Sequence, residues 1–412
     1  MKYGCIGEHL AHSFSREIHT RLADYEYELC EISPEGLDSF AAERNFKAIN
    51  VTIPYKERIM PHLYEIDDGA GLIGAVNTVV NRDGRLYGYN TDFYGMCELI
   101  KHAGVEISGK KVAILGTGGT AKTARAVATA LGASEILTVS RTKRDGVIDY
   151  AELIESHLDR QVIINTTPVG MYRDFDGVPI DVSLFTSLEG VIDAVYNPLR
   201  TRLVSDAMAR GIKAEGGLYM LVAQAVRASE IFLDVTYPAG TTDRIYGEMM
   251  KDKENIVLIG MPTCGKSTVG RILSEITWRE VIECDERIVN EVGADIPAIF
   301  KNEGEAKFRE YEAAVVRAVA QDTGKIISTG GGAILNPLNI ERLKRNGRIY
   351  FIDRPLEALV PTADRPLSST REQIEARYHE RYELYRLGAD RIISGELTAD
   401  QTAEKILEDF EG

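Results

Sequence analysis

Two stretches of this sequence decide its fold. The first is Lys111-Val-Ala-Ile-Leu115 followed by Gly116-Thr-Gly-Gly-Thr120, and the second is Asn255-Ile-Val-Leu-Ile259 followed by Gly260-Met-Pro-Thr-Cys-Gly-Lys-Ser267. In each stretch, a short apolar run enters a glycine-rich turn that precedes a helical pattern. Such turns aim backbone amides at a phosphate group. The sequence therefore predicts an α/β chain with two nucleotide-binding units.

The surrounding pattern alternates short apolar runs with helical segments, as buried parallel sheets do. The predicted strands cover 135–140, 161–165, 190–194 and 212–215 in the first unit, and 255–259, 280–284, 325–328 and 348–352 in the second. We expect an α/β substrate domain over 1–108 that helices within 218–250 complete. A Rossmann-type domain over 109–217 and a P-loop domain with a parallel sheet over 254–412 follow. The charged segment 249–254 is interpreted as a helix end and a short linker.

Composition limits the partners. The 412 residues carry a formal net charge of -15, which disfavours nucleic acid and anionic membranes as partners. No apolar run is long enough to span a bilayer. The five cysteines are scattered, without metal-ligand spacing, and indicate a reducing cytoplasm. The oligomeric state is not fixed by these features, and a homo-oligomer stays open.

The first glycine motif alone also fits a turn made for packing. The next predicted strand makes the interpretation of this motif more specific. That strand ends in Ser140-Arg141-Thr142-Lys143-Arg144, with no carboxylate for ribose hydroxyls. Arginine forks and hydroxyls suit a 2′-phosphate. This basic turn favours NADP over NAD and over a solvated surface turn.

Polar clusters precede the dinucleotide motif, at His12-Ser13-Phe14-Ser15, Asn50–Lys56, Gly74–Thr78 and Gly88–Asp92. Short donors and acceptors of this kind suit a substrate with several hydroxyls and a carboxylate. A Lys paired with an Asp suits proton transfer to a carbonyl that receives hydride. Ser, Asn, Asp and Thr also populate ordinary turns, and spacing alone favours that simpler interpretation.

Residues 1–248 resemble the shikimate dehydrogenase family in the order and wording of these segments. The matching motifs include Tyr3–Gly7, the serine cluster, Asn50–Lys56, Asn90-Thr91-Asp92, Asn165–Met171, Asp193–Pro198 and Gly216–Gln224. The resemblance implies that Lys56 and Asp92 are the catalytic pair. It implies a shikimate site made of Ser13, Ser15, Thr52, Lys56, Asn77, Asp92, Tyr196 and Gln224. It places next to NADP the residues Asp68, Gly116, Thr117, Gly118, Gly119, Thr120, Ser140, Arg141, Thr142, Lys143, Arg144, Ala194 and Gly217.

The second glycine motif, with Gly260, Gly265, Lys266 and Ser267 after a strand and before a helix, predicts a P-loop. Its backbone amides and Lys266 would hold phosphates, and the Ser267 hydroxyl would ligate Mg²⁺. A P-loop identifies a nucleotide but no acceptor. Two arginines near one Asp suit a small hydroxylated carboxylate, although surface ion pairing is the usual role of Arg.

Residues 255–410 are similar to the shikimate kinase family. The resemblance implies an ATP site with Thr263, Cys264, Gly265, Lys266, Ser267, Thr268 and Arg365. It implies an acceptor site with Asp285, Arg309, Gly331 and Arg381, in which Asp285 and Arg365 take part in catalysis. Two departures stand out: Glu283 replaces the first Asp of the usual Asp-x-Asp, and the segment before Arg365 lacks a basic residue that is often present.

The combined interpretation is a fused enzyme of aromatic biosynthesis. NADPH would reduce 3-dehydroshikimate to shikimate, and ATP with Mg²⁺ would phosphorylate it to shikimate 3-phosphate. Two alternatives remain open at this stage. The first half is instead a dehydrogenase that also accepts quinate, or the second half is a nucleotide-binding regulatory module with weak kinase activity.

Overall fold

The computed structural model describes residues 1–10, 13–361 and 370–412, and these residues form two compact units, Met1–Met249 and Met250–Gly412. Helix α9 (Thr241–Lys253) contains the boundary between them. The sequence predicted a helix end and a short linker over 249–254. The helix ends within this segment, at Lys253, and Glu254 alone links it to the next strand, because no Gly or Pro breaks the helix earlier.

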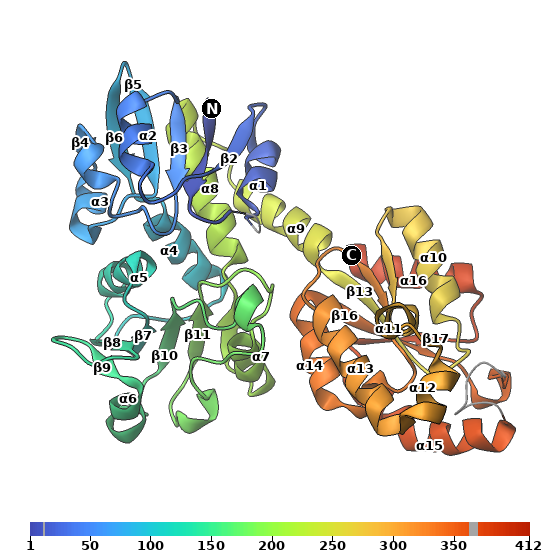
Figure 1. Cartoon of the computed structure of the whole chain (residues 1–412). Coiled ribbons are helices and arrows are strands. Elements are labelled where there is room, and N and C mark those ends of the chain that lie inside the picture. The colour runs from blue at the N-terminus through green and yellow to red at the C-terminus, as the bar shows by residue number, and fades with distance from the viewer. Residues whose placement is uncertain (11–12, 362–369) are drawn as a thin grey trace. The chain divides into compact units, whose positions relative to one another are not determined.

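The first sheet of the first unit has six strands in the order β2-β1-β3-β5-β6-β4 (Figure 1). Its strands are β1 (Tyr3–Gly7), β2 (Tyr27–Glu31), β3 (Ala48–Val51), β4 (Glu65–Ile66), β5 (Thr78–Arg82) and β6 (Arg85–Tyr89). Its helices are α1 (Ser15–Leu22), α2 (Leu37–Glu43) and α3 (Asp68–Ile73). The central strands β1 and β3 pair in parallel, and both are almost fully buried, so their carboxyl ends meet at one edge of the sheet.

The second sheet has the strand order β12-β11-β10-β7-β8-β9, and every pairing in it is parallel. Its strands are β7 (Lys111–Leu115), β8 (Glu135–Ser140), β9 (Ile148–Asp149), β10 (Val162–Asn165), β11 (Gly190–Asp193) and β12 (Lys213–Glu215). The helices are α5 (Gly119–Ala130), α6 (Tyr150–Ser156) and α7 (Arg202–Ala209). This order reverses direction between β7 and β10, which is where doubly wound sheets bind a dinucleotide.

Two helices connect the sheets of the first unit. Helix α4 (Asp92–His102) packs against α8 (Leu218–Leu233) and against α5, while α8 also contacts β3 and β5 (Figure 1). Buried Met96 and Met220 belong to the same apolar cluster as Val112 and Val127. This shared core joins α4 and α8 to the second sheet and to the helix that begins at the glycine turn.

The second unit contains a parallel sheet with the order β14-β15-β13-β16-β17. Its strands are β13 (Asn255–Ile259), β14 (Val281–Glu283), β15 (Ile326–Ser328), β16 (Gly347–Asp353) and β17 (Arg391–Ser394). The helices are α10 (Lys266–Thr277), α11 (Cys284–Val292), α12 (Ile296–Asn302), α13 (Gly304–Val319), α14 (Pro337–Asn346), α15 (Arg371–Gly388) and α16 (Ala399–Glu411). The predicted α/β fold class is confirmed for both units. Across the described ranges, with 11–12 and 362–369 left aside, no helix is long and apolar enough to cross a membrane.

Candidate active sites

A lysine and an aspartate meet at the edge of the first sheet. Lys56 follows the turn after β3, and Asp92 is the first residue of α4. The Lys56 Nζ lies 2.5 Å from Asp92 Oδ2, and both side chains are largely buried. The sequence placed these two residues together, and the structure does the same. In an ion pair that is shielded from water, the proton donor and the proton acceptor are held in a fixed position.

Asparagine and glutamine side chains complete this group. Asn77 donates from Nδ2 to Asp92 Oδ1 over 2.9 Å, and its Oδ1 accepts from the backbone amide of Thr91 over 2.8 Å. The Gln224 Oε1, from α8, lies 3.5 Å from Asn77 Nδ2. Asn77, Asp92 and Gln224 are all buried. Four of the predicted shikimate-site residues therefore form one connected cluster.

The predicted serines lie together with Tyr196. Ser13 donates from Oγ to Ser15 Oγ over 3.1 Å, and Ser13 also hydrogen-bonds Tyr196. Burial raises the pKa of Tyr196 to about 12, so its hydroxyl stays protonated at neutral pH. The Phe14 ring packs on Tyr196 with the centroids 5.3 Å apart. His12, in the same motif, lies outside the described residues.

Cys5 of β1 lies near both groups, close to Lys56 and to Tyr196. Burial raises the pKa of the Cys5 thiol to about 12, which keeps it neutral. Thr52 lies at the same edge, where its Cγ2 is 2.7 Å from the position that a Cβ on Gly7 would occupy. The predicted substrate residues thus gather around the carboxyl ends of β1 and β3.

The glycine turn after β7 opens toward this cluster. Gly116 has φ of 113°, and a Cβ there would come 2.5 Å from Thr166 Oγ1, so a side chain does not fit. A Cβ on Gly119 would lie 3.7 Å from Cδ of Lys56, so the first turn of α5 lies against the lysine. Lys122 of α5 also pairs with Glu57 over 2.8 Å. A dinucleotide on the α5 amides would extend toward Lys56.

The basic turn after β8 is exposed from Arg141 to Arg144. Ser140 donates from Oγ to the Thr142 carbonyl over 2.6 Å, and Thr142 N donates back to Ser140 Oγ over 3.2 Å. Lys143 pairs with Glu152 over 2.6 Å, so its charge is partly neutralised. Among the predicted cations of this turn, Arg141 and Arg144 have no ion pair with a described residue.

The remaining predicted NADP neighbours are dispersed. Gly217 packs on Ala194, because a Cβ at Gly217 would lie 2.3 Å from the Ala194 carbonyl oxygen. Asp68 is exposed at the start of α3, a helix that contacts α5. Asp193, the first residue of the Asp193–Pro198 motif, has no role predicted from the sequence. It is fully buried and accepts from Thr201 Oγ1 over 2.6 Å, and burial raises its pKa to about 6.

The second glycine turn has the geometry of a phosphate cradle. Gly260, Thr263 and Gly265 have positive φ angles of 148°, 66° and 105°. Lys266 is buried, and its Nζ donates to the carbonyls of Gly260 and Met261 over 2.9 and 3.1 Å. These carbonyls hold the ammonium inside the loop, where a phosphate would replace them as its partner. Ser267 and Thr268 are exposed at the start of α10.

The predicted acceptor residues converge on Gly330–Gly332, after β15. Arg381 donates from Nη1 to the Gly331 carbonyl over 3.1 Å, and a Cβ on Gly332 would collide with the Arg309 guanidinium. A Cβ on Gly331 would lie 2.8 Å from Pro262 of the P-loop. The two arginines therefore reach the same glycine segment, which packs directly on the P-loop.

One buried carboxylate in this group was missed from the sequence. Glu312 accepts from Arg309 Nη1 over 2.8 Å, and burial raises its pKa. A Cβ on Gly330 would meet both Asp285 Oδ1 and Glu312 Oε1, so the two carboxylates face the same segment. Glu312 lies three residues after Arg309 on α13, and that helical spacing is the signal that could have found it.

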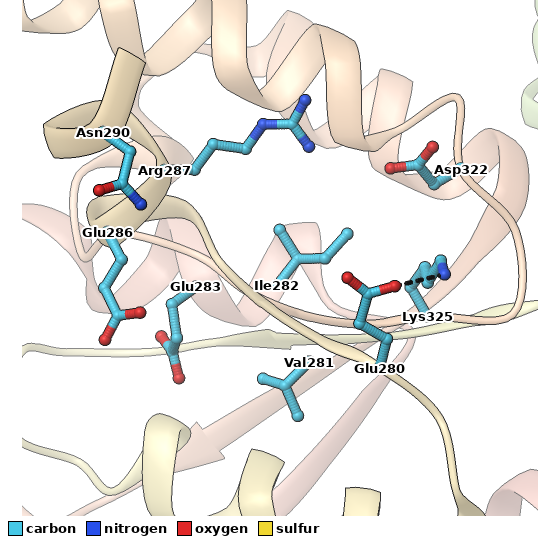
Figure 2. A pocket seen from close by; sticks show the side chains of 9 residues that line it. All are labelled: Glu280, Val281, Ile282, Glu283, Glu286, Arg287, Asn290, Asp322 and Lys325. Atoms are coloured by element: carbon cyan, nitrogen blue, oxygen red, sulfur yellow. Dashed lines mark hydrogen bonds and ion pairs between the residues drawn. The ribbon is translucent and has the colours of Figure 1, made fainter. Parts of the chain in front are cut away.

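Two further residues were noted from the sequence, Glu283 and Arg365. Glu283 lines a surface hollow beside β14 together with Glu286 and Asn290 (Figure 2). In the same hollow Glu280 pairs with Lys325 over 2.7 Å. Arg365, the predicted catalytic arginine, lies outside the described residues. Among the described residues, no cluster of three His, Cys, Asp or Glu side chains has the arrangement of a metal site.

Taken together, the folds and sites define an α/β dinucleotide-dependent oxidoreductase joined to a P-loop phosphotransferase. Family models agree with both halves. The shikimate dehydrogenase substrate binding domain matches residues 5–79, and shikimate kinase matches residues 262–411.

Relatives of known name and structure cover the first half. Shikimate dehydrogenase (NADP(+)) of Clostridium perfringens strain SM101 is 36% identical over 265 residues, which span 60% of this chain and 97% of that protein. The crystal structure of shikimate dehydrogenase 1 from Peptoclostridium difficile aligns with a TM-score of 0.57 and 37% identity, covering 60% of this chain and 98% of that one. A shikimate 5-dehydrogenase from Thermus thermophilus, in complex with NADP(H) and shikimate, aligns with a TM-score of 0.55 and 28% identity, over 60% of this chain and 99% of that one. The chain therefore belongs to the shikimate dehydrogenase family, and it carries a shikimate kinase domain in its C-terminal part.

Proposed function

We propose that this chain catalyses two consecutive reactions on one small acid. The first unit reduces 3-dehydroshikimate to shikimate with NADPH, and the second transfers the γ-phosphoryl group of ATP to a shikimate hydroxyl. One observation carries the first half of the proposal: the Lys56–Asp92 pair lies against the first turn of α5. Hydride from a nicotinamide bound there would reach a carbonyl whose oxygen takes a proton from Lys56.

The assignment of substrate contacts rests on the same cluster. Asn77, Gln224, Ser13, Ser15, Thr52 and Tyr196 offer neutral donors and acceptors for ring hydroxyls and a carboxylate. For the cofactor, Arg141 and Arg144 on the exposed turn after β8 would bind the 2′-phosphate through forked donors. Gly116–Thr120 would hold the pyrophosphate at the α5 N-terminus. Asp68, Ala194 and Gly217 would lie along the nicotinamide half.

For the kinase, the proposal rests on the convergence of Arg309 and Arg381 at Gly330–Gly332 beside the P-loop. The two guanidinium groups would hold the shikimate carboxylate, and Asp285 would accept a hydrogen bond from the attacked hydroxyl. The loop from Thr263 to Thr268 would bind the ATP phosphates. A Mg²⁺ ion would neutralise phosphate charge there, and the exposed Ser267 hydroxyl at the helix start is suited to ligate it.

A single assay tests both reactions. The purified chain is given 3-dehydroshikimate and NADPH, then ATP and Mg²⁺, and the products are identified by mass. We expect shikimate in the first step and shikimate 3-phosphate in the second. NADPH oxidation that ignores 3-dehydroshikimate would overturn the first assignment. ATP hydrolysis that does not depend on shikimate would favour a regulatory nucleotide-binding module in place of a kinase.

Quinate is the second candidate substrate for the first unit. The paired serines Ser13 and Ser15 favour shikimate, and competition between the two acids in the oxidative direction separates them. We further propose a cytoplasmic location, which the five free cysteines and the two soluble cofactors support.

A further inference from the structure

A row of buried polar side chains runs behind Asp92 and away from the substrate cluster. Its members come from strands β2, β3 and β5, from the residue before β5 and from the turn before α4, and they are Tyr27, Asn50, Asn77, Thr78 and Thr91. All of them are less than a tenth exposed. Buried polar groups are costly unless they bond one another, so such a row has a structural or functional cause.

The row is a continuous chain of hydrogen bonds. Tyr27 donates from its hydroxyl to Asn50 Oδ1 over 2.7 Å, and Asn50 donates from Nδ2 to Thr78 Oγ1 over 3.2 Å. Thr78 in turn donates to Asn77 Oδ1 over 3.1 Å. The chain ends at the catalytic pair, because Asn77 Nδ2 donates to Asp92 Oδ1.

The donors and acceptors allow one consistent direction from Tyr27 to Asp92, and Thr91 Oγ1 lies beside the chain, 3.2 Å from Thr78 Oγ1. A hydroxyl has one hydrogen, so Thr78 can donate to Asn77 while its lone pair accepts from Asn50. The Asn50 amide keeps its NH₂ toward Thr78 because its oxygen accepts from Tyr27. Two backbone groups support the same direction: the Asn77 carbonyl accepts from Asn50 Nδ2 over 3.3 Å, and the Thr91 amide donates to Asn77 Oδ1.

We infer that Tyr27 is a positioning residue for carbonyl reduction, acting through Asn50 and Thr78 on the Asn77 amide that holds Asp92 toward Lys56. The inference rests on the proposed reductase function. The Tyr27 hydroxyl bonds Asn50 and is connected to Asp92 through the intervening side chains. Tyr27 fixes the end of the hydrogen-bond chain that is farthest from Asp92, and it affects the rate through the orientation of the Asp92 carboxylate.

The ring of Tyr27 has a separate, structural role. It stacks on His19 with the ring centroids 3.9 Å apart and the planes at 8°. Replacing Tyr27 with Phe keeps this stack and removes only the hydroxyl. Tyr55 offers a matched control, because it is also buried and its hydroxyl donates to the Ile32 carbonyl, which is not part of the chain.

The experiment measures steady-state reduction by the full-length chain, normalised to the number of NADPH-binding sites found by titration. This normalisation removes any effect of a misfolded fraction. We expect Tyr27→Phe to lower kcat about fivefold with KM for both substrates unchanged, as the loss of one hydrogen bond in a catalytic network predicts. Tyr55→Phe should keep kcat within about twofold of the native value. Equal kcat values for the two variants would overturn the inference.

A double-mutant cycle tests the route through Thr78. Thr78→Val keeps the side-chain shape and breaks the chain in its middle, and we expect it to lower kcat about tenfold. Combining Thr78→Val with Tyr27→Phe should lower kcat little further, because the hydrogen-bond chain from Tyr27 to Asn77 is already broken at Thr78. When Thr78→Val is combined with Tyr55→Phe, the two fold-decreases in kcat should multiply. Multiplying losses in the Tyr27 pair would show that Tyr27 acts independently of the chain and would overturn the proposed route.

The two proposals fail in distinguishable ways. A native chain that does not reduce 3-dehydroshikimate defeats the proposed function before any variant is compared. An active native chain in which Tyr27→Phe is indistinguishable from Tyr55→Phe defeats the positioning role alone. Phosphorylation of shikimate by the same preparations should be unchanged in every variant, because Tyr27, Tyr55 and Thr78 all lie in the first unit.

Discussion

The reductase and kinase sites of this chain are prepared for their ligands in different ways. In the first unit Lys56 and Asp92 already contact each other, and the bonds of Asn77 fix the carboxylate. In the second unit the cationic side chains already pair with acceptors of the protein itself. Lys266 donates to carbonyls of its own loop, and Arg309 pairs with Glu305 and Glu312.

The difference follows from what each site must bind. A carbonyl needs one proton source at a fixed distance, so rigidity contributes directly to the rate. A kinase binds several negative charges. Acceptors within the protein hold its arginines and its lysine in place until an anion displaces those acceptors.

Removing the preassembled proton donor should have the largest effect. We expect Lys56→Ala to lower the rate of 3-dehydroshikimate reduction about a thousandfold, in the range typical of a lost general acid. Shikimate phosphorylation by the same preparation serves as the control and should not change. NADPH absorbance follows the first reaction and a coupled ADP assay the second. Equal losses in both would contradict separate sites.

The buried carboxylate of Asp193 should make the first unit sensitive to pH. Burial raises its pKa from the usual 3.8 to about 6. Since the folded pKa lies above the unfolded one, the stability linked to this group is present below about pH 4 and is lost as the pH rises through 6. From pH 4 to 7 the free energy of unfolding should fall by about 2 to 3 kcal/mol through this group.

The Asp193→Asn variant stays neutral, so this part of the loss should disappear from its stability profile. Calorimetry of the full chain can follow the transition that NADPH shifts upward, which belongs to the first unit. Glu312→Gln is the comparison in the second unit, where Arg309 opposes the effect of burial. We expect a smaller change there. Parallel pH profiles for Asp193→Asn and the native chain would refute the assignment.

In the kinase unit, the arginines should act mainly on substrate affinity. We expect Arg381→Met to raise KM for shikimate about thirtyfold, as for the loss of a charge-assisted hydrogen bond, with KM for ATP unchanged. Arg386→Met is the matched control, since Arg386 lies on the same helix and pairs with exposed Glu383. A similar increase for ATP and shikimate would mean that Arg381 supports the fold of the site and not the carboxylate.

The exposed cofactor turn should give the smallest effect, because solvent screens its charges. Arg141→Asp should lower the preference for NADPH over NADH about tenfold, measured as the ratio of kcat/KM values. Lys143→Gln should change that ratio less, because Glu152 already neutralises the ammonium. A larger effect at Lys143 than at Arg141 would move the 2′-phosphate from one side of the turn to the other.

Local pattern was enough to predict much of the fold. The runs 135–140 and 255–259 coincide with β8 and β13, and the helix after Gly119 begins where the glycine turn ends. Strand β17 was not predicted, because Arg391 and Ser394 bracket only two apolar residues and three of its four positions are exposed. Its position depends on pairing with β16, which a local pattern does not reveal.

The site residues likewise fall into those that a local pattern predicts and those that it does not. Lys56, Asp92, Arg309 and Arg381 could be named because they occur in motifs that resemble those of the two families; spacing alone did not single them out. Tyr27 was missed because its partner Asn50 is 23 residues away and the chain from Asn50 to Asp92 runs through two further side chains. Contacts between distant segments, each of which looks like ordinary polar sequence by itself, are a property of the folded chain.

The joint between the two units has a practical consequence for dividing this protein. Glu254, the single residue between α9 and β13, is buried and accepts from Arg348 over 3.0 Å. Lys251 likewise donates to the Glu411 carbonyl, and Arg279 donates to the Lys251 carbonyl. The last turn of α9 is therefore the amino-terminal anchor of the kinase fold. A kinase fragment that starts at the P-loop strand would lose that anchor, and one that starts at Met250 would retain it.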